Sequence, residues 1–245
     1  NGEWIFSGDG GLATSTSLAL PTGLFVDGSD NIYIVDAGNN RIRKVDRAGM
    51  ITTMAGSSNI PGFSGDGGPA TSARLNISSP VGIFVNESGD IFFPDTGNDR
   101  IRKVDTSGMI STVAGGGESE SFDAEIAATD VEINGPADVF GDRSGEIYIA
   151  QGAYIRKLDN SGMVSTVAGG GHWWPGIGVW GYSGDGEPAK KANFDGAIGV
   201  FVDRDNIYIA DKNNHRIRWV TSSGMISTVV GNGKGGFSGD GGSAV

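Results

Sequence analysis

Residues 30–56 read DNIYIVDAGNNRIRKVDRAGMITTMAG, and the same pattern returns as GDIFFPDTGNDRIRKVDTSGMISTVAG over residues 89–115. Two further copies occupy residues 146–169 and 206–231. A Gly-Met pair marks the period, and the methionines lie 59, 54 and 62 residues apart (Met50, Met109, Met163 and Met225). One unit is therefore written four times, and the fold depends on how such units stack.

Each unit contains four short apolar or alternating runs, which in the first copy are residues 22–27, 31–35, 42–45 and 50–55. The runs are rich in Val, Ile, Tyr, Phe and Thr and are bounded by Gly, Asn, Asp and Ser, which is typical of strands and tight turns. Each unit therefore predicts a four-stranded antiparallel meander. Such a sheet cannot bury both of its faces alone, so repeated meanders predict the packed blades of a β-propeller.

We expect one all-β propeller domain over residues 1–245 with four blades. The expected blades are residues 21–56, 80–115, 136–169 and 197–231. Gly/Asp-rich inserts occupy the remaining ranges, which are residues 1–20, 57–79, 116–135, 170–196 and 232–245.

The quoted segments resemble the NHL-repeat β-propellers, whose units read P-x-G-[IL]-x-V-D, G-N-I-Y-I-A-D, N-N-R-I-R-K-V and G-x-I-S-T-V-A-G. The first of these patterns matches at residues 21–27, 80–86, 136–141 and 197–203, although the last copy lacks the proline. The resemblance covers nearly the whole chain and implies the propeller fold. It does not imply one function, because this architecture carries unrelated activities.

The chain has a net charge of −11, no cysteine and 43 glycines. An acidic chain without a basic face argues against nucleic acid and against an anionic membrane surface as partners. The absence of cysteine excludes disulfides and zinc–thiolate sites. No apolar run reaches the ~18 residues of a spanning helix, so no membrane insertion is expected.

An aspartate and an arginine recur at the same places in three units, as Asp36 with Arg41, Asp95 with Arg100, and Asp211 with Arg216. In the third unit both are replaced together, by Gln151 and Tyr154. Because the two positions are lost together, we expect them to form a charge-assisted bond that braces the turn between the second and third strands. The expected role is structural.

The inserts repeat a Ser-Gly-Asp-Gly motif whose aspartates are Asp9, Asp66, Asp185 and Asp240. Structural turns are the favoured interpretation, because the motif lacks the several carboxylates of a calcium loop and the lysine of a phosphate loop. Calcium stays open as a weak alternative ligand for these four aspartates, and no other cofactor is expected.

The insert before the fourth unit contains three of the five tryptophans among glycines. We expect a surface that binds a protein or a glycan there, formed by Trp173, Trp174, Trp180 and Tyr182. The alternative is that these rings pack over blade edges. Only His172 and His215 are present, too few for a His-based zinc site.

Two N-x-S sequons make Asn76 and Asn86 candidates for glycosylation. Asn86 is predicted at a hairpin tip. Together with the predicted binding surface, they favour an extracellular or cell-surface location.

The chain starts in one insert and ends in the next copy of the same insert, so two inserts would compete for one place in a closed ring. Three arrangements remain open: a segment of a longer propeller, self-association through the terminal inserts, or four blades that close with the tail displaced. The chain starts without Met, which is typical of a processed chain or a fragment.

The sequence favours a non-catalytic extracellular or surface scaffold for protein or glycan binding or self-assembly. The alternative is a propeller enzyme, either a lyase or a lactone hydrolase. The resemblance implies that such an enzyme holds a divalent metal in the central channel. Catalytic residues are not identified.

Overall fold

The structure is a computed structural model that describes residues 8–78, 81–119, 125–170, 181–236, 240, 242 and 244. The chain forms two units, of which unit 1 comprises Asn1–Ser119 with Ala128–Val139 and unit 2 comprises Glu120–Ala127 with Phe140–Val245. Each unit is described by itself.

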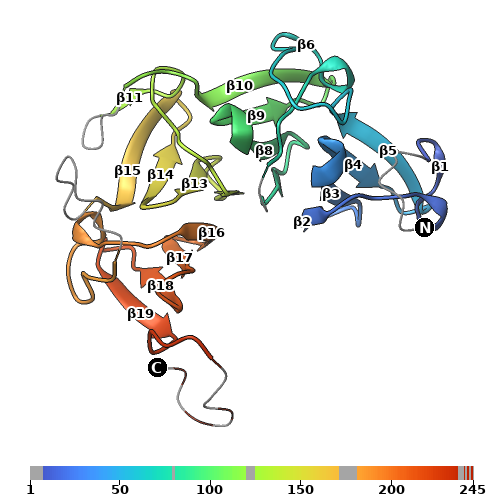
Figure 1. Cartoon of the computed structure of the whole chain (residues 1–245). Helices are drawn as coiled ribbons and strands as arrows, with labels where there is room; N and C mark the ends of the chain where they lie inside the picture. Colours follow the sequence, from blue (N-terminus) through green and yellow to red (C-terminus); the bar gives the residue numbers. More distant parts are fainter. Residues whose placement is uncertain are drawn as a thin grey trace. The chain divides into compact units, whose positions relative to one another are not determined.

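Unit 1 contains two antiparallel sheets (Figure 1). Blade 1 has the strand order β1-β5-β4-β3-β2, with β1 (Gly11–Leu12), β2 (Pro21–Val26), β3 (Ile32–Asp36), β4 (Arg41–Val45) and β5 (Met50–Ala55). Blade 2 has the order β6-β10-β9-β8-β7, with β6 (Gly68–Pro69), β7 (Phe84–Val85), β8 (Ile91–Asp95), β9 (Arg100–Val104) and β10 (Met109–Gly115).

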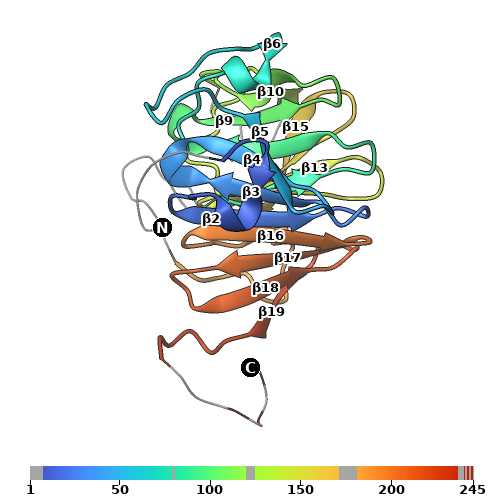
Figure 2. The ribbon, with the colours of Figure 1, turned by 90° about the vertical axis from the view of Figure 1, so that its right-hand side faces the viewer.

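Unit 2 repeats the plan. Blade 3 has the order β11-β15-β14-β13-β12, with β11 (Ile126–Ala127), β12 (Asp138–Gly141), β13 (Ile147–Gln151), β14 (Tyr154–Leu158) and β15 (Met163–Gly169). Blade 4 has the order β16-β17-β18-β19, with β16 (Ala197–Asp203), β17 (Asn206–Asp211), β18 (Arg216–Val220) and β19 (Ile226–Val230). Figure 2 shows these four strands of blade 4 edge to edge.

The predicted all-β propeller of four antiparallel blades is confirmed. Short 3-10 turns are the helical pieces of the described residues, namely η1 (Ala13–Ser15), η2 (Ala37–Asn39), η3 (Ala70–Ser72), η4 (Thr96–Asn98) and η5 (Ala189–Lys191). The described residues contain no helix with the length and hydropathy that a membrane crossing requires.

The sequence did not predict the fifth strand of three blades. The insert before each of blades 1, 2 and 3 adds a two-residue strand to the outer edge of that blade, where β1, β6 and β11 pair with β5, β10 and β15. In blade 4 the equivalent contact is a single bridge between Pro188 and Met225. The inserts thereby cover the N–H and C=O groups that an outer strand would leave unpaired.

In blades 1 and 2 a glycine at or just after the end of the last strand binds the next insert. Gly115 has φ +85°, and a Cβ there would lie 2.3 Å from the carbonyl oxygen of Asp99. Its N–H donates to the Ala128 carbonyl at 2.8 Å, just as the Gly56 N–H donates to the Ala70 carbonyl at 3.0 Å. The glycine therefore permits a close backbone approach that fixes the insert on the blade.

Within each unit the first blade packs its trailing face on the leading face of the second blade. In unit 1 one buried cluster joins Val35, Ile42 and Ala55 of the trailing face of blade 1 to Ile83 and Ile91 of the leading face of blade 2.

In unit 2 the cluster joins Ala150, Ile155 and Ala168 of blade 3 to Val200 and Ile207 of blade 4. Both units thus bury apolar sheet faces against a sister sheet, which is the packing that the repeat predicts.

Candidate functional site

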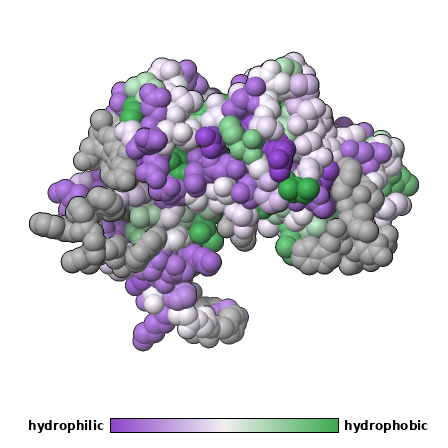
Figure 3. Space-filling view, turned by 45° about the horizontal axis from the view of Figure 1, so that its top comes forward, coloured by the Kyte–Doolittle hydropathy of each residue, from purple (hydrophilic) through white to green (hydrophobic). Residues whose placement is uncertain are grey.

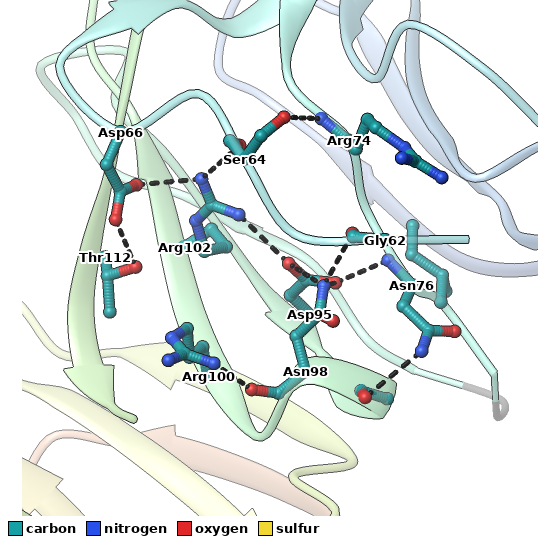
Figure 4. Close-up of polar contacts among 12 residues, drawn as sticks. Gly62, Ser64, Asp66, Arg74, Asn76, Asp95, Asn98, Arg100, Arg102 and Thr112 are labelled. Carbon is teal, nitrogen blue, oxygen red and sulfur yellow. Dashed lines mark hydrogen bonds and ion pairs between the residues drawn. The ribbon is translucent and has the colours of Figure 1, made fainter. Parts of the chain in front are cut away.

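A buried arginine in blade 2 joins the end of β8 to the insert (Figure 4). The Arg102 side chain is fully buried, and its Nη1 lies 3.0 Å from Asp95 Oδ2. Its Nη2 lies 2.8 Å from Asp66 Oδ1 and donates to the Ser64 carbonyl at 3.3 Å. The charge is therefore held between two carboxylates, one from the blade and one from the insert.

The Asp95 carboxylate is held on several sides. It accepts hydrogen bonds from the Asn76 backbone N–H at 2.7 Å and from Asn98 Nδ2 at 2.9 Å. Burial raises the pKa of the Asp95 carboxyl, against the lowering effects of these hydrogen bonds and of Arg102. Because the hydrogen-bonding capacity of the Asp95 carboxylate is used within the protein, its role is to brace the fold.

The same bridge recurs in blades 1 and 4. Arg43 lies 3.5 Å from Asp36 and 2.9 Å from Asp9. Arg218 lies 3.4 Å from Asp211 and 2.8 Å from Asp185. Both arginine side chains are fully buried, and burial again raises the pKa of Asp211.

These contacts correct the predicted partner of the aspartates. The structure pairs Asp36, Asp95 and Asp211 with Arg43, Arg102 and Arg218, two residues beyond the predicted Arg41, Arg100 and Arg216. The cause is geometric: Asp95 lies directly opposite Arg100 in the β8–β9 register, but its carboxylate meets the diagonal neighbour two residues along.

The predicted arginines bind backbone carbonyls instead. Arg100 Nη1 donates to Asn98 O at 2.6 Å, and its guanidinium lies 4.1 Å from the Phe63 ring centroid. Arg216 Nη1 donates to Asn214 O at 3.0 Å. Arg41 Nη1 donates to Asn39 O at 2.9 Å. Each closes the corner between the second and third strands.

Blade 3 keeps the buried arginine although its aspartate is gone. Arg156 is buried opposite Thr166, and its guanidinium lies 5.4 Å from the Tyr154 ring centroid. Gln151 takes the place of the aspartate. Three copies read Arg-Ile-Arg and the third copy reads Tyr-Ile-Arg, so the second arginine is present in all four copies. This retention is the signal that could have identified the residue.

The insert aspartates, weak candidates for calcium, bind cationic or hydroxyl groups. Asp66 Oδ2 accepts from Thr112 Oγ1 at 2.7 Å while Oδ1 faces Arg102, and Asp9 accepts from both Arg43 and Thr53. A guanidinium beside the carboxylate repels a metal cation, which disfavours calcium binding at that aspartate. Among the described residues, groups of three or more metal-ligating side chains are absent. Asp240 is exposed.

Of the predicted aromatic surface, Tyr182 is described, whereas Trp173, Trp174 and Trp180 lie outside the described residues, as does His172. The Tyr182 hydroxyl donates to Asp185, and its ring centroid lies 3.7 Å from the Arg216 guanidinium. Phe63 takes the same position in unit 1, above Arg100. Tyr182 therefore anchors the insert to blade 4.

His215 occupies a backbone turn. It has φ +52°, like Asn40 at +49° and Asp99 at +55° in the same turn of blades 1 and 2. These residues carry the left-handed conformation that the β17–β18 and equivalent corners require. The position is thus explained by turn geometry.

Both sequon asparagines make structural hydrogen bonds. Asn76 Nδ2 donates to the Gly97 carbonyl at 3.1 Å. Asn86 lies in the turn between β7 and β8, where its Oδ1 accepts from the Asp90 N–H at 2.8 Å and its Nδ2 makes a 3.5 Å contact with Asp90 Oδ2. The Asn86 amide nitrogen is thus the less strongly held of the two.

Comparison with known proteins places the repeat in a family. The model of the teneurin NHL domain matches residues 5–64 and 61–134. Teneurin-1 of Gallus gallus is 31% identical over 242 residues, which cover 89% of this chain and 9% of that protein. The chain therefore spans less than a tenth of the length of this relative.

Solved structures share the fold at lower identity. One chain in a nidogen/laminin complex superimposes with a TM-score of 0.59 and 16% identity, covering 89% of this chain and 69% of that one. A streptogramin B lyase structure gives a TM-score of 0.51 and 16% identity, covering 85% and 53%. At these identities the likeness concerns the fold alone. The four-fold repeat, its bracing arginines and the family match agree: the chain belongs to the teneurin NHL-domain family of β-propellers.

Proposed function

We propose that this chain is a non-catalytic propeller scaffold that binds a protein or glycan partner outside the cell or at the cell surface. The proposed contact surface is the aromatic loop, residues 170–182. The observation that carries the proposal is that this loop is longer than its counterpart in unit 1 and that the added length contains the tryptophans.

Equivalent anchors define the two loops. In unit 1 the loop leaves Gly56 and returns at Gly62, whose carbonyl accepts from Asn98 Nδ2 at 2.9 Å. In unit 2 the loop leaves Gly169 and returns at Gly181, whose carbonyl accepts from Asn214 Nδ2 at 2.9 Å.

The anchor spacings are 62−56, which is 6, and 181−169, which is 12. The unit 1 loop thus closes the same corner with six residues fewer than the unit 2 loop. Six extra residues are not needed for the fold.

Composition indicates what the extra length is for. Trp173, Trp174 and Trp180 lie between the two anchors, whereas the unit 1 loop reads Ser-Ser-Asn-Ile-Pro. Tryptophan and tyrosine are enriched among residues that contribute most to binding energy at interfaces, because they bury a large area and keep a polar group. The anchors at Gly181 and Tyr182 would hold such a surface at a fixed edge of blade 4.

The polar residues that repeat in the blades support a scaffold. Asp36, Asp95 and Asp211 face buried arginines. The same arginines contact the insert aspartates Asp9, Asp66 and Asp185. An enzyme with a divalent metal in the channel remains the alternative. Metal analysis of the purified protein distinguishes them, because a stoichiometric ion retained after dialysis would favour the enzyme.

A loop exchange tests the proposal directly. Residues 170–180 are replaced by the Ser57–Pro61 sequence, which spans the equivalent anchors. We expect the exchanged protein to retain its melting temperature and to lose staining of cultured cells by the fluorescent, multimerised domain. Trp173→Ala with Trp174→Ala should act in the same direction, and Ile60→Ala in the short loop is the matched control.

Treatment of the cells identifies the partner class. Trypsin should abolish staining if the partner is a protein, and glycosidases should abolish it if the partner is a glycan. Staining that survives the loop exchange would place binding elsewhere. A large fall in melting temperature in the double Trp variant would show that the rings belong to the packed fold.

A further inference from the structure

Two lysines lie at the junction of blades 3 and 4, beside the start of the aromatic loop. The 3-10 turn η5 ends in Lys190 and Lys191, and both residues are exposed. A Cβ on Gly170, the first residue of the loop, would lie 3.8 Å from the Lys190 carbonyl oxygen, so the two segments are side by side. The same two positions of the other inserts carry no lysine and read Thr14-Ser15, Thr71-Ser72 and Thr129-Asp130.

The other end of the aromatic loop also lies against cations. The Arg216 guanidinium lies 3.7 Å from the Tyr182 ring centroid, and its Nη2 donates to the Asn232 carbonyl at 3.3 Å. Asn232 Oδ1 accepts from the backbone N–H of the exposed Lys234 at 3.0 Å. Positive side chains therefore flank both ends of the loop and form a cationic rim, namely Lys190, Lys191, Arg216 and Lys234.

The charge of the cationic rim is available to a ligand. Within the part of the chain that the structure describes, the cationic rim makes no ion pair with a carboxylate. The carboxylate that contacts Tyr182 is that of Asp185, and Arg218 engages it at 2.8 Å. By contrast, Lys157 of blade 3 is paired with Glu146 at 2.8 Å. A chain of net charge −11 thus presents unpaired positive charge around the aromatic loop.

We infer that the partner of the aromatic loop is an anionic polysaccharide, whose sulfate or carboxylate groups bind the cationic rim. The inference rests on the proposed function and names the class of its partner. A polysaccharide is favoured over a protein because lysine is depleted at protein interfaces. The lysine ammonium is a strongly hydrated point charge, which suits anionic groups that stay partly hydrated at a surface.

Surface plasmon resonance on immobilised heparin, a sulfated polysaccharide that also carries carboxylates, tests the inference. The wild type should bind heparin, and binding should weaken as the ionic strength is raised to about 0.15 M and beyond. Neutral dextran should give no binding. Hyaluronan carries carboxylates without sulfate, so equal binding to hyaluronan assigns the carboxylate as the bound group, and binding to heparin alone assigns the sulfate.

Neutralising the two lysines locates the site. Lys190→Gln with Lys191→Gln should bind heparin about tenfold more weakly, because two exposed charge contacts are lost. Arg47→Gln with Arg143→Gln is the matched control, since it removes the same charge from two other exposed positions and should bind like the wild type. All four residues are exposed, so both double variants should keep the wild-type melting temperature.

Wild-type protein that binds neither heparin nor hyaluronan overturns the inference. It is equally overturned if the two double variants lose affinity to the same extent, because net charge rather than the rim would then control binding. Equal binding to a single-stranded DNA of similar charge also overturns it, because the rim would then attract any polyanion.

Cell staining separates this inference from the proposed function. Staining that survives the loop exchange overturns both. Staining that the loop exchange abolishes, but that the double lysine variant retains, overturns the anionic polysaccharide alone and leaves the scaffold function standing.

Discussion

Arg102 Nη1 lies 3.0 Å from Asp95 Oδ2, and neither side chain is exposed to solvent. Asp66 from the insert approaches the other side of the same guanidinium. The pair thus ties three segments that are distant in sequence, namely β8, β9 and the insert. Similar bridges in blades 1 and 4 make the buried arginine the polar centre of the repeat.

Removal of the Asp95 carboxylate should destabilise unit 1 strongly. Asp95→Ala leaves a buried guanidinium with one partner fewer, which we expect to lower the free energy of unfolding by about 3 kcal/mol. Asp95→Gln should cost less, because blade 3 already accommodates Gln151 at this position in a blade whose Arg156 is also buried. Urea unfolding measures both variants.

Arg47→Ala is the matched control, since Arg47 and Asp30 form an exposed pair at 3.5 Å. Exposed pairs contribute about 0–1 kcal/mol. An Asp95→Ala cost no larger than that of Arg47→Ala would contradict the bracing role.

Asp185 should make stability depend on pH. Burial acts to raise its pKa, but hydrogen bonds from Tyr182 and Thr228, together with Arg218, outweigh burial and leave the pKa below its ordinary value. The ionised carboxylate therefore stabilises the folded state above the unfolded-state pKa, and this contribution is lost as the pH falls through the lower folded-state pKa.

We expect Asp185→Asn to lower the urea midpoint near neutral pH, and the difference from the wild type to shrink as the pH is lowered to about 2. The contribution of Asp95 to stability has the opposite pH dependence, because burial raises the pKa of Asp95 and its protonation therefore favours the folded state. A difference between Asp185→Asn and wild type that is constant with pH would show that its charge is unimportant.

The glycine that ends each blade should tolerate no side chain. Gly115→Ala places a Cβ 2.3 Å from the Asp99 carbonyl in addition to straining a backbone with φ +85°. Gly108→Ala is the control, because it has φ +81° and its Cβ would meet nothing within 4 Å. The strain alone costs roughly 1–2 kcal/mol, and we expect Gly115→Ala to lower the melting temperature clearly further. Equal effects would mean that the close approach relaxes without cost.

The repeat predicts the blades well because strand alternation and turn residues act locally. Asn40 and Asp99 lie in the left-handed corner turns that short polar residues favour. The partner of Asp95 could not be predicted in this way. Arg100 and Arg102 lie two apart on one strand, and the choice between them depends on Asp66, which lies 36 residues before Arg102 in the sequence.

The fifth strands and the exposure of Leu24 also escaped prediction. The pairing of Gly68–Pro69 with β10 spans two residues, which is too short for any periodicity. Exposure of Leu24 cannot be read from a pattern that it shares with the buried Ile83, because the difference comes from what packs on it.

Glycosylation should discriminate between the two sequons. A glycan on Asn76 would break its hydrogen bond to Gly97, where space is tight, since a Cβ on Gly97 would lie 2.3 Å from Asn76 Nδ2. Asn86 is more weakly held, in the turn before β8. After expression through a eukaryotic secretory pathway, we expect Asn86→Gln to remove a glycan mass from the folded protein and Asn76→Gln to leave it unchanged. The reverse mass pattern would contradict this assignment.

The net charge of the chain predicts how salt affects its stability. In the view of Figure 3, hydrophilic residues predominate and apolar residues form small separate patches. With a net charge of −11, like charges within the folded chain repel one another at low salt. We therefore expect the melting temperature to rise as salt screens this repulsion, which thermal unfolding at two salt concentrations measures. A melting temperature that falls as salt is raised would indicate that attractive ion pairs, rather than the net repulsion, dominate the salt dependence of stability.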